Sequence, residues 1–273
     1  MPPKPTTNMP GTPIKRLMEL AKTLQFAWFV GHAITLFSSL LCLTSFRPLL
    51  YRLAYFGVLE SFGIITYQHY FIKSGPAAGT SSGSAARTIT PASLLQNGDV
   101  LYFLMAIVWT FTPQFTLSLV PYMMFSVFHV LIYVKSILLP EVFNLNASNS
   151  KMVLFIDNTV RSYNERCMYW VGSAELGILA CLLLRVIFWY PRSLVLFASY
   201  STFIKFRFEN SKYMKSAFAQ WRVRLDGIMS HPSIPIPLKK AYNKSKSLLI
   251  RLSEFRLAKS PVPPQSAHAS KAE

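Results

Sequence analysis

Among the ionisable side chains within or beside long apolar stretches of the sequence, six are candidates for a function, because a charge there is costly unless it has a partner or a function. These residues are His32, Arg52, Glu60, His129, Glu175 and Arg185. Histidines can ligate a metal ion, and carboxylates beside imidazole or guanidinium groups can form a polar transport or catalytic site. The spacing of the residues decides which of these uses the sequence supports.

The two histidines lack the neighbours of a metal site. Neither His32 nor His129 has another His, a Cys or a carboxylate three or four residues away, which is the spacing that brings two ligands to one face of a helix. We therefore expect both to be hydrogen-bonded structural residues, and we expect no metal site and no cofactor.

The carboxylates cannot pair within their own helices. Glu60 follows Arg52 by eight residues, about 80° around a helix, and Glu175 and Arg185 are ten residues apart. We expect them to make contacts between helices that fix the packing, since an unpaired carboxylate in hydrocarbon becomes protonated or finds a donor.

A different arrangement of the same groups would indicate another class of protein. If Glu60, His129, Glu175 and Arg185 converged in one wet cavity, the chain would be a small transporter or a lipid-handling membrane enzyme. The sequence itself has no nucleophile beside a base, no paired carboxylates and no Gly-rich phosphate loop, so we expect a protein that is not an enzyme.

Long apolar stretches must position these side chains. The chain has 273 residues, of which 52% are hydrophobic and 14% are charged, whereas soluble domains carry about 25% charged residues. We expect an all-α polytopic membrane protein of three helical hairpins, at residues 24–72, 100–139 and 167–206. The second hairpin should turn near residues 112–118, although one long kinked helix is an alternative, and the third should turn near Pro191.

Polar segments separate the hairpins. We expect a cytosolic N-terminal segment at residues 1–23, a flexible Gly/Ser loop at 73–99 and an amphipathic connector at 140–166. Basic amphipathic helices should follow at 207–259, and a disordered tail at 260–273.

The basic residues are concentrated after the last apolar stretch. The net charge is +17, and the residues from Lys205 onward hold 14 Lys and Arg against 4 acids. Basic residues in this position follow the positive-inside rule and bind anionic lipid. We therefore expect both termini in the cytosol and membrane lipid, not nucleic acid, as the partner of the basic region.

Two amphipathic patterns in this region predict membrane-binding helices. The first combines the apolar residues Met214, Phe218, Trp221, Leu225 and Ile228 with the basic residues Lys212, Lys215 and Arg222. The second combines the apolar residues Leu249, Leu252 and Phe255 with the basic residues Lys239, Lys240, Lys244 and Lys246. Two alternatives remain: either helix packs on the membrane domain or on a partner protein, or the basic tail recruits an acidic soluble partner.

Two stretches also carry a distinctive order of aromatic, proline and basic residues. The first contains Asp99, Tyr102, Phe103, Leu104, Pro113, Ser118, Pro121, Phe125, Ser126, Phe128, His129, Tyr133 and Lys135. The second contains Phe203, Lys205, Arg207, Tyr213, Phe218, Arg222, Asp226 and Pro232. With Glu175 between them, these residues resemble the transmembrane protein 33 family, also called the Krüppel homologue 2 family. The Gly/Ser segment at residues 74–90 departs from the family pattern.

The resemblance implies residence in the endoplasmic reticulum and nuclear envelope, and a role in tubule shape or in nuclear pore distribution. The family's fungal branch includes a pore-membrane nucleoporin. Implied partners are reticulon-like proteins that shape the endoplasmic reticulum, nucleoporins and nuclear transport receptors. The hairpins and interfacial helices agree with this role, because they occupy more area in one leaflet than in the other and so favour curved membrane.

Overall fold

Every regular element in the described part of the chain is a helix. The computed structural model describes residues 12–72, 91–145 and 150–254. The elements are α1 (Pro13–Ala21), α2 (Leu24–Ser45), α3 (Pro48–Tyr67), η1 (Gln68–Ile72), α4 (Pro91–Gln96), α5 (Gly98–Phe111), η2 (Thr116–Ser118), α6 (Leu119–Tyr133), η3 (Val134–Val142), α7 (Lys151–Ile187), α8 (Ser193–Asn210), α9 (Lys212–Ser230) and α10 (Ile236–Glu254). The expected all-α class is confirmed.

The chain divides into two compact units. The first covers Met1–Asp226 and contains the hydrophobic core, and the second covers Gly227–Glu273 and contains the end of α9 and all of α10. The polar groups within the apolar stretches all belong to the first unit.

The first hairpin is held by close backbone approach between α2 and α3. Gly31 and Gly57 face each other, and a Cβ added to Gly57 would lie only 2.5 Å from the Gly31 carbonyl oxygen. The Thr35 hydroxyl donates to the Ala54 carbonyl at 3.3 Å. Small residues at such positions let two membrane helices approach each other, and the left-handed backbone at Phe46 (φ 53°) ends α2 before Pro48 begins α3.

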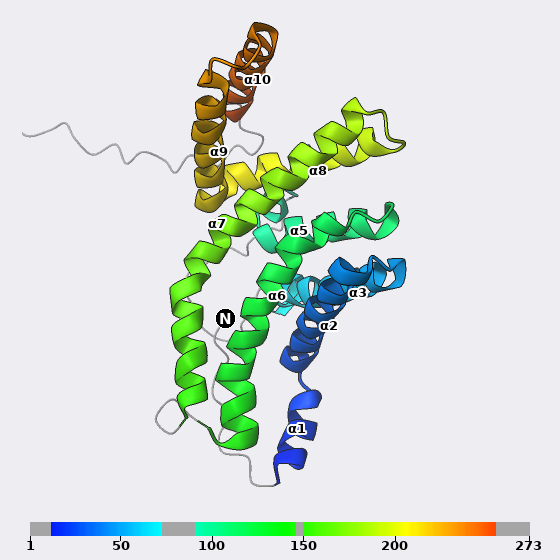
Figure 1. The fold of residues 1–273 in the computed structure, drawn as a ribbon. Coiled ribbons are helices and arrows are strands. Elements are labelled where there is room, and N and C mark those ends of the chain that lie inside the picture. The colour runs from blue at the N-terminus through cyan, green and yellow to red at the C-terminus, as the bar shows by residue number, and fades with distance from the viewer. Residues whose placement is uncertain (1–11, 73–90, 146–149, 255–273) are drawn as a thin grey trace, which may run out of the picture. The chain divides into compact units, whose positions relative to one another are not determined.

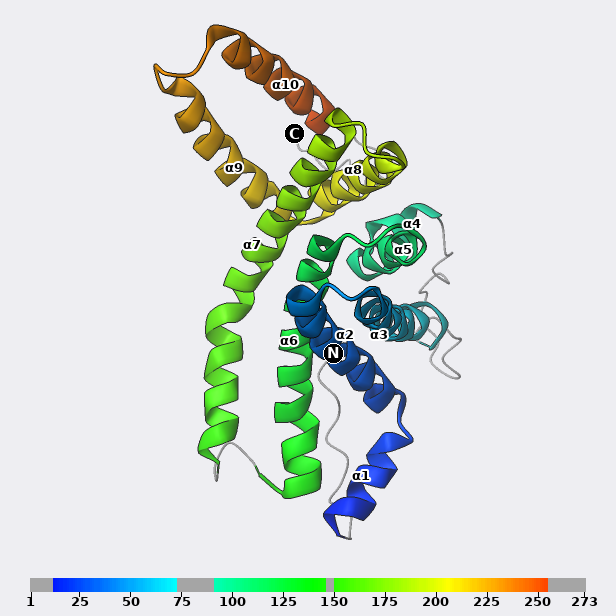
Figure 2. The ribbon, with the colours of Figure 1, turned by 45° about the vertical axis from the view of Figure 1, so that its right-hand side comes forward.

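In the second hairpin α5 has 14 residues, whereas α6 has 15 and continues into the 9 residues of η3; in the third, α7 has 37 residues and α8 has 18. A turn at residues 112–118 separates α5 from α6, and a turn at 188–192, which contains Pro191, separates α7 from α8. Both turns lie where the sequence predicts them. The helix α6 with η3 runs beside the N-terminal half of α7 (Figure 2), where Lys135 and Asp157 form an ion pair at 2.6 Å.

Two expected boundaries differ from the structure. The predicted connector at 140–166 is not a separate surface helix, because α7 runs without interruption for 37 residues. No proline lies between Lys151 and Ile187, so nothing breaks the helix at residue 166. The predicted loop at 73–99 also ends earlier, since α4 and α5 occupy most of residues 91–99; its residues 73–90 lie outside the described ranges, as does the predicted tail at 260–273.

Within the residues that the structure describes, four helical stretches are long and apolar enough to cross a membrane. They are Leu24–Ser45, Pro48–Ile72, Thr116–Val142 and Lys151–Ile187. In contrast, α5 has 14 residues and extends about 21 Å, and α8 carries Lys205, Arg207 and Glu209 near its C-terminal end. The partners within the second and third hairpins therefore differ in apolar length.

The three hairpin turns lie on one side of the first unit, at the right of Figure 1. There the Gln114 side chain donates to the Phe46 carbonyl at 3.2 Å, which connects the first turn to the second. The Arg185 guanidinium lies 5.6 Å from the Phe115 ring centroid and 5.2 Å from that of Tyr190, which connects the second turn to the third.

Candidate functional site

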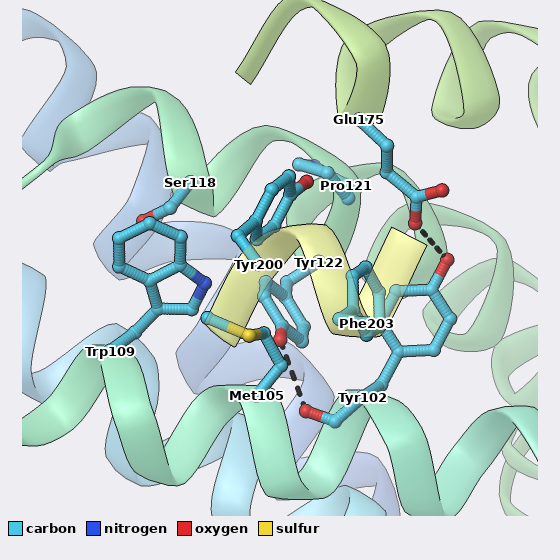
Figure 3. A pocket seen from close by; sticks show the side chains of 9 residues that line it. All are labelled: Tyr102, Met105, Trp109, Ser118, Pro121, Tyr122, Glu175, Tyr200 and Phe203. Carbon is cyan, nitrogen blue, oxygen red and sulfur yellow. Dashed lines mark hydrogen bonds between the residues drawn. The ribbon is translucent and has the colours of Figure 1, made fainter. Parts of the chain in front are cut away.

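A buried polar cluster joins α5, α7 and α8 in the core of the first unit. Glu175 is 0% exposed, and the Tyr102 hydroxyl donates a hydrogen bond to it (Figure 3). Arg207 approaches the second carboxylate oxygen at 3.6 Å, which makes an ion pair that is too long for a hydrogen bond. The guanidinium also lies 4.9 Å from the centroid of the Tyr102 ring. The expected contact between helices at Glu175 is therefore present, and its partner is Arg207.

The cavity beside this cluster is very small. Tyr102, Tyr122, Tyr200 and Glu175 contribute to its lining, and the Tyr122 hydroxyl spans it to donate to the Tyr102 carbonyl at 3.0 Å (Figure 3). The space open to the centre of a water molecule is about 10 Å³, which is the lower limit for one water. A substrate of a transporter or a lipid-handling enzyme does not fit there.

The two intramembrane histidines lie side by side. His32 on α2 and His129 on α6 have ring centroids 4.5 Å apart, and Trp28 lies with its ring edge-on to both. The His32 Nδ1 shares a hydrogen bond of 3.1 Å with the Ser126 hydroxyl. Each histidine is alone in its own segment of the sequence. The contact between them joins two helices that are far apart along the chain, so the sequence does not reveal it. Within the described ranges no three metal-ligating side chains come together.

The four groups of the alternative polar site do not converge. Glu175 lines the small cavity, whereas His129 contacts His32 and Arg185 lies between two aromatic rings. Glu60 is half-buried on α3 and does not line the cavity. Their dispersal agrees with structural roles at separate helix contacts.

The N-terminal half of α9 packs on protein, which corrects the predicted membrane role of its apolar stripe. Met214 and Ala217 are buried, and Phe218 and Trp221 pack against the core cluster. A Cβ added to Gly172 of α7 would lie 3.2 Å from the Ala217 Cβ. Met214, Phe218 and Trp221 are therefore occupied by the first unit and are not free to enter lipid.

The basic residue at the start of α9 is also engaged. Lys212 forms an ion pair with Glu165 at 3.7 Å, and the Tyr213 hydroxyl donates to the same carboxylate at 3.4 Å. The neighbouring Tyr213 and then Glu165 raise the pKa of Lys212 above its ordinary value, so the ammonium form is favoured. All three predicted basic residues on this helix, Lys212, Lys215 and Arg222, are exposed.

This packing predicts different effects for two alanines of α9. Ala217→Leu should lower the free energy of unfolding by about 1–3 kcal/mol, because the added methyl groups must enter the contact with Gly172. Ala219→Leu is the control, since Ala219 is exposed on the same helix. Thermal unfolding of the purified chain in detergent measures both, and equal melting temperatures would contradict the contact.

The second unit presents the other predicted stripe. No residue of α10 is buried within the structure, and Leu249 and Leu252 are 54% and 60% exposed. Lys240 and Lys244 are exposed, and Lys239 and Lys246 are half-exposed. Leu225 is half-buried and Ile228 is exposed near the C-terminal end of α9. Phe255 lies outside the described residues.

Known proteins are similar to this chain over nearly all of its described length. The family described as Transmembrane protein 33/Nucleoporin POM33 matches residues 12–254. The "Pore membrane protein of 33 kDa" of Saccharomyces cerevisiae is 52% identical, over 91% of this chain and 90% of the relative. No solved structure matches.

Two further relatives are more distant. The "Nucleoporin POM33" of Chaetomium thermophilum is 30% identical, over 90% of this chain and 91% of its own length. The "Pore and endoplasmic reticulum protein of 33 kDa" of Saccharomyces cerevisiae is 27% identical, over 89% of this chain and 95% of its own length. These names describe membrane proteins of the pore and of the endoplasmic reticulum, and none of them describes an enzyme. The helical membrane fold, the residues first noted for their resemblance and these matches agree, and the chain belongs to the Transmembrane protein 33/Nucleoporin POM33 family.

Proposed function

We propose that this protein is a non-enzymatic membrane protein of the nuclear envelope and endoplasmic reticulum that stabilises curved membrane near nuclear pores and serves as a scaffold for partners there. The observation that carries the proposal is the exposed apolar stripe of α10 beside its lysines. The names of its relatives support the location.

The membrane unit supports a shaping role through its unequal apolar lengths. The helices α2 and α3 have 22 and 20 residues and extend about 33 and 30 Å. The neighbouring α5 extends only about 21 Å, whereas a typical hydrocarbon core is about 30 Å thick. A bilayer adapts to such mismatch by local thinning or tilt, and mismatch on one side of a protein favours a bent surface.

The helix α10 supports the same role from the second unit. Its apolar residues Leu238, Tyr242, Leu249 and Leu252 recur on one face. Lys239 and Lys246 flank that face, and Lys240 and Lys244 lie farther around the helix. A helix of this type lies in the headgroup plane with its apolar face a few Å deep. Each lysine near an anionic surface adds about 1 kcal/mol of binding free energy. We therefore place α10 on the cytosolic leaflet, with both termini in the cytosol.

Partners would then gather at the same membrane. Nucleoporins, reticulon-like proteins and nuclear transport receptors are the partners that we propose, with the exposed basic residues of α10 as their contact. An acidic soluble partner would bind the lysines and leave the leucines unused. The contribution of the leucines therefore separates membrane binding from protein recruitment.

A double substitution tests the role of α10. The protein is expressed with a fluorescent tag in Saccharomyces cerevisiae cells that lack the yeast relative 52% identical to it. There the tagged protein should be enriched at the nuclear rim. Leu249→Asp with Leu252→Asp should abolish that enrichment, because two carboxylates on the apolar face prevent its insertion into the headgroup region. The variant should still resist extraction by alkaline carbonate, since its membrane unit is unchanged.

The matched control is Asn243→Asp with Ser247→Asp, which adds the same two charges on the opposite face of the exposed helix. This variant should keep most of the enrichment. If the control and the leucine variant behaved alike, charge alone would decide the location and the membrane role of α10 would be wrong.

A further inference from the structure

The three hairpin turns form one continuous surface of the first unit. Hydrogen bonding from Gln114 to the Phe46 carbonyl and the position of Arg185 between Phe115 and Tyr190 connect the three turns. We call this surface, at residues 45–48, 111–117 and 187–194, the turn face. It lies at the right of Figure 1.

The charge of the turn face has a single sign. Arg47 and Arg192 lie on it, and Arg52 and Arg185 lie within two turns of helix from it. All 11 acidic residues of the chain lie elsewhere in the sequence. Arg47 and Arg192 are exposed, and neither forms an ion pair with any residue that the structure describes. Such a surface is complementary to an anionic ligand.

Large aromatic side chains surround these arginines. Phe111 is 85% exposed and Trp189 is 90% exposed, and Phe46 and Phe188 are exposed beside them. Aromatic rings mixed with arginines are typical of the interface between hydrocarbon and headgroups, where one end of a side chain is apolar and the other is wet. The turn face thus has the composition of an interfacial surface.

The backbone of the turns is left-handed at three positions. Phe46, Trp189 and Arg192 have φ values of 53°, 57° and 64°, in the left-handed region that glycine adopts without cost. A glycine at any of these turns would relieve the strain. These left-handed residues end α2 and α7 and precede α8, and they place Phe46, Trp189 and Arg192 on the turn face.

We infer that the turn face binds anionic phospholipid headgroups in the leaflet that the turns reach, through Arg47 and Arg192. The lengths of α2 and α3 match one bilayer crossing, so the first turn lies at a headgroup layer when α1 lies at the other. Guanidinium groups form bidentate pairs with phosphate oxygens. The exposed rings of Phe111 and Trp189 then lie just below the phosphates. This contact is separate from the cytosolic contact of α10.

Trp189 reports the depth of the turn face in the full-length protein. The emission of Trp189 is obtained by subtracting the emission of the Trp189→Phe variant from that of the wild-type chain, with both proteins reconstituted in phospholipid vesicles. A nitroxide near the top of the lipid acyl chain should quench this signal more than a nitroxide near the middle of the chain. Stronger quenching by the deeper label, or no quenching by either label, would overturn the inference.

The charge preference is tested with the same signal. A top-labelled phosphatidylserine present as a minor component should quench Trp189 more than the matching phosphatidylcholine does. Each arginine is expected to enrich anionic lipid about fivefold, so Arg47→Gln with Arg192→Gln should remove about a thirtyfold preference.

Two matched variants make the result specific. Arg47→Lys with Arg192→Lys keeps both charges and should retain most of the preference. Lys239→Gln with Lys240→Gln removes two charges from α10 and should leave the preference at Trp189 unchanged. Equal quenching by the two lipids in the wild type, or a preference that survives Arg47→Gln with Arg192→Gln, would overturn the inference.

Discussion

Replacing Glu175 with leucine should severely destabilise the first unit. The substitution leaves the Arg207 guanidinium, whose side chain is 12% exposed, without its carboxylate, and it removes the acceptor of the Tyr102 hydroxyl. Removing one partner of a buried ion pair costs about 3–5 kcal/mol, because the remaining charge stays desolvated. Thermal unfolding in detergent should show a large fall in melting temperature, and the yield of membrane-extracted protein should fall with it.

Two comparisons make this test specific. Glu165→Leu removes a 70% exposed carboxylate of the same helix from its ion pair with Lys212, and an exposed pair is worth at most about 1 kcal/mol. The double variant with Glu175→Leu and Arg207→Leu should recover part of the lost stability, because no charge is then left buried. If the Glu175→Leu and Glu165→Leu variants had the same melting temperature, the buried pair would not stabilise the contact between α7 and α8.

The turns of the second and third hairpins could be located from the sequence because apolar length and helix breakers are local properties. The turns at 112–118 and 188–192 coincide with runs that contain Pro113 and Pro191, and each long apolar run was about twice one crossing. The unbroken α7 was not predicted, although the sequence indicates it, since no proline separates the polar half of this helix from its apolar half. There the composition changes within one helix, and a change in composition does not by itself end a helix.

For the polar contacts, the sequence predicts that a buried group needs a partner but does not identify that partner. Burial cost indicates that Glu175 needs a partner but not which one, and Arg207 lies 32 residues further along the chain. The contact between His32 and His129 joins α2 to α6, which are far apart along the chain, so spacing along one helix could not reveal it. Contacts of this kind depend on which helix faces pack together.

The stripe on α9 shows a different limit. A stripe that contains Met214 and Trp221 has the same period whether lipid or protein covers it. What distinguishes the two cases is the small residue Ala217 on that helix and Gly172 on α7, which together allow close approach. In contrast, no residue of α10 is buried, and Leu249 and Leu252 of its stripe are exposed, which agrees with a softer surface such as lipid.

The close contact of α2 with α3 leads to the second large expected effect. Gly57→Ala should lower the free energy of unfolding by about 3 kcal/mol, because the new Cβ would lie 2.5 Å from the Gly31 carbonyl oxygen and 2.8 Å from the Thr35 hydroxyl. Real Cβ atoms do not approach backbone oxygen so closely, so the two helices must separate. A loss of stability is notable here because alanine is the better helix former by about 1 kcal/mol.

Gly177→Ala is the matched control, since a Cβ at Gly177 on α7 meets nothing within 4 Å. That substitution should leave stability unchanged or raise it by up to about 1 kcal/mol. Both variants make the same chemical change inside a membrane helix, so opposite shifts in melting temperature would isolate the contact between α2 and α3 as the cause. Equal shifts would show that the hairpin adapts to a methyl group, and that its packing is looser than the distance between Gly31 and Gly57 requires.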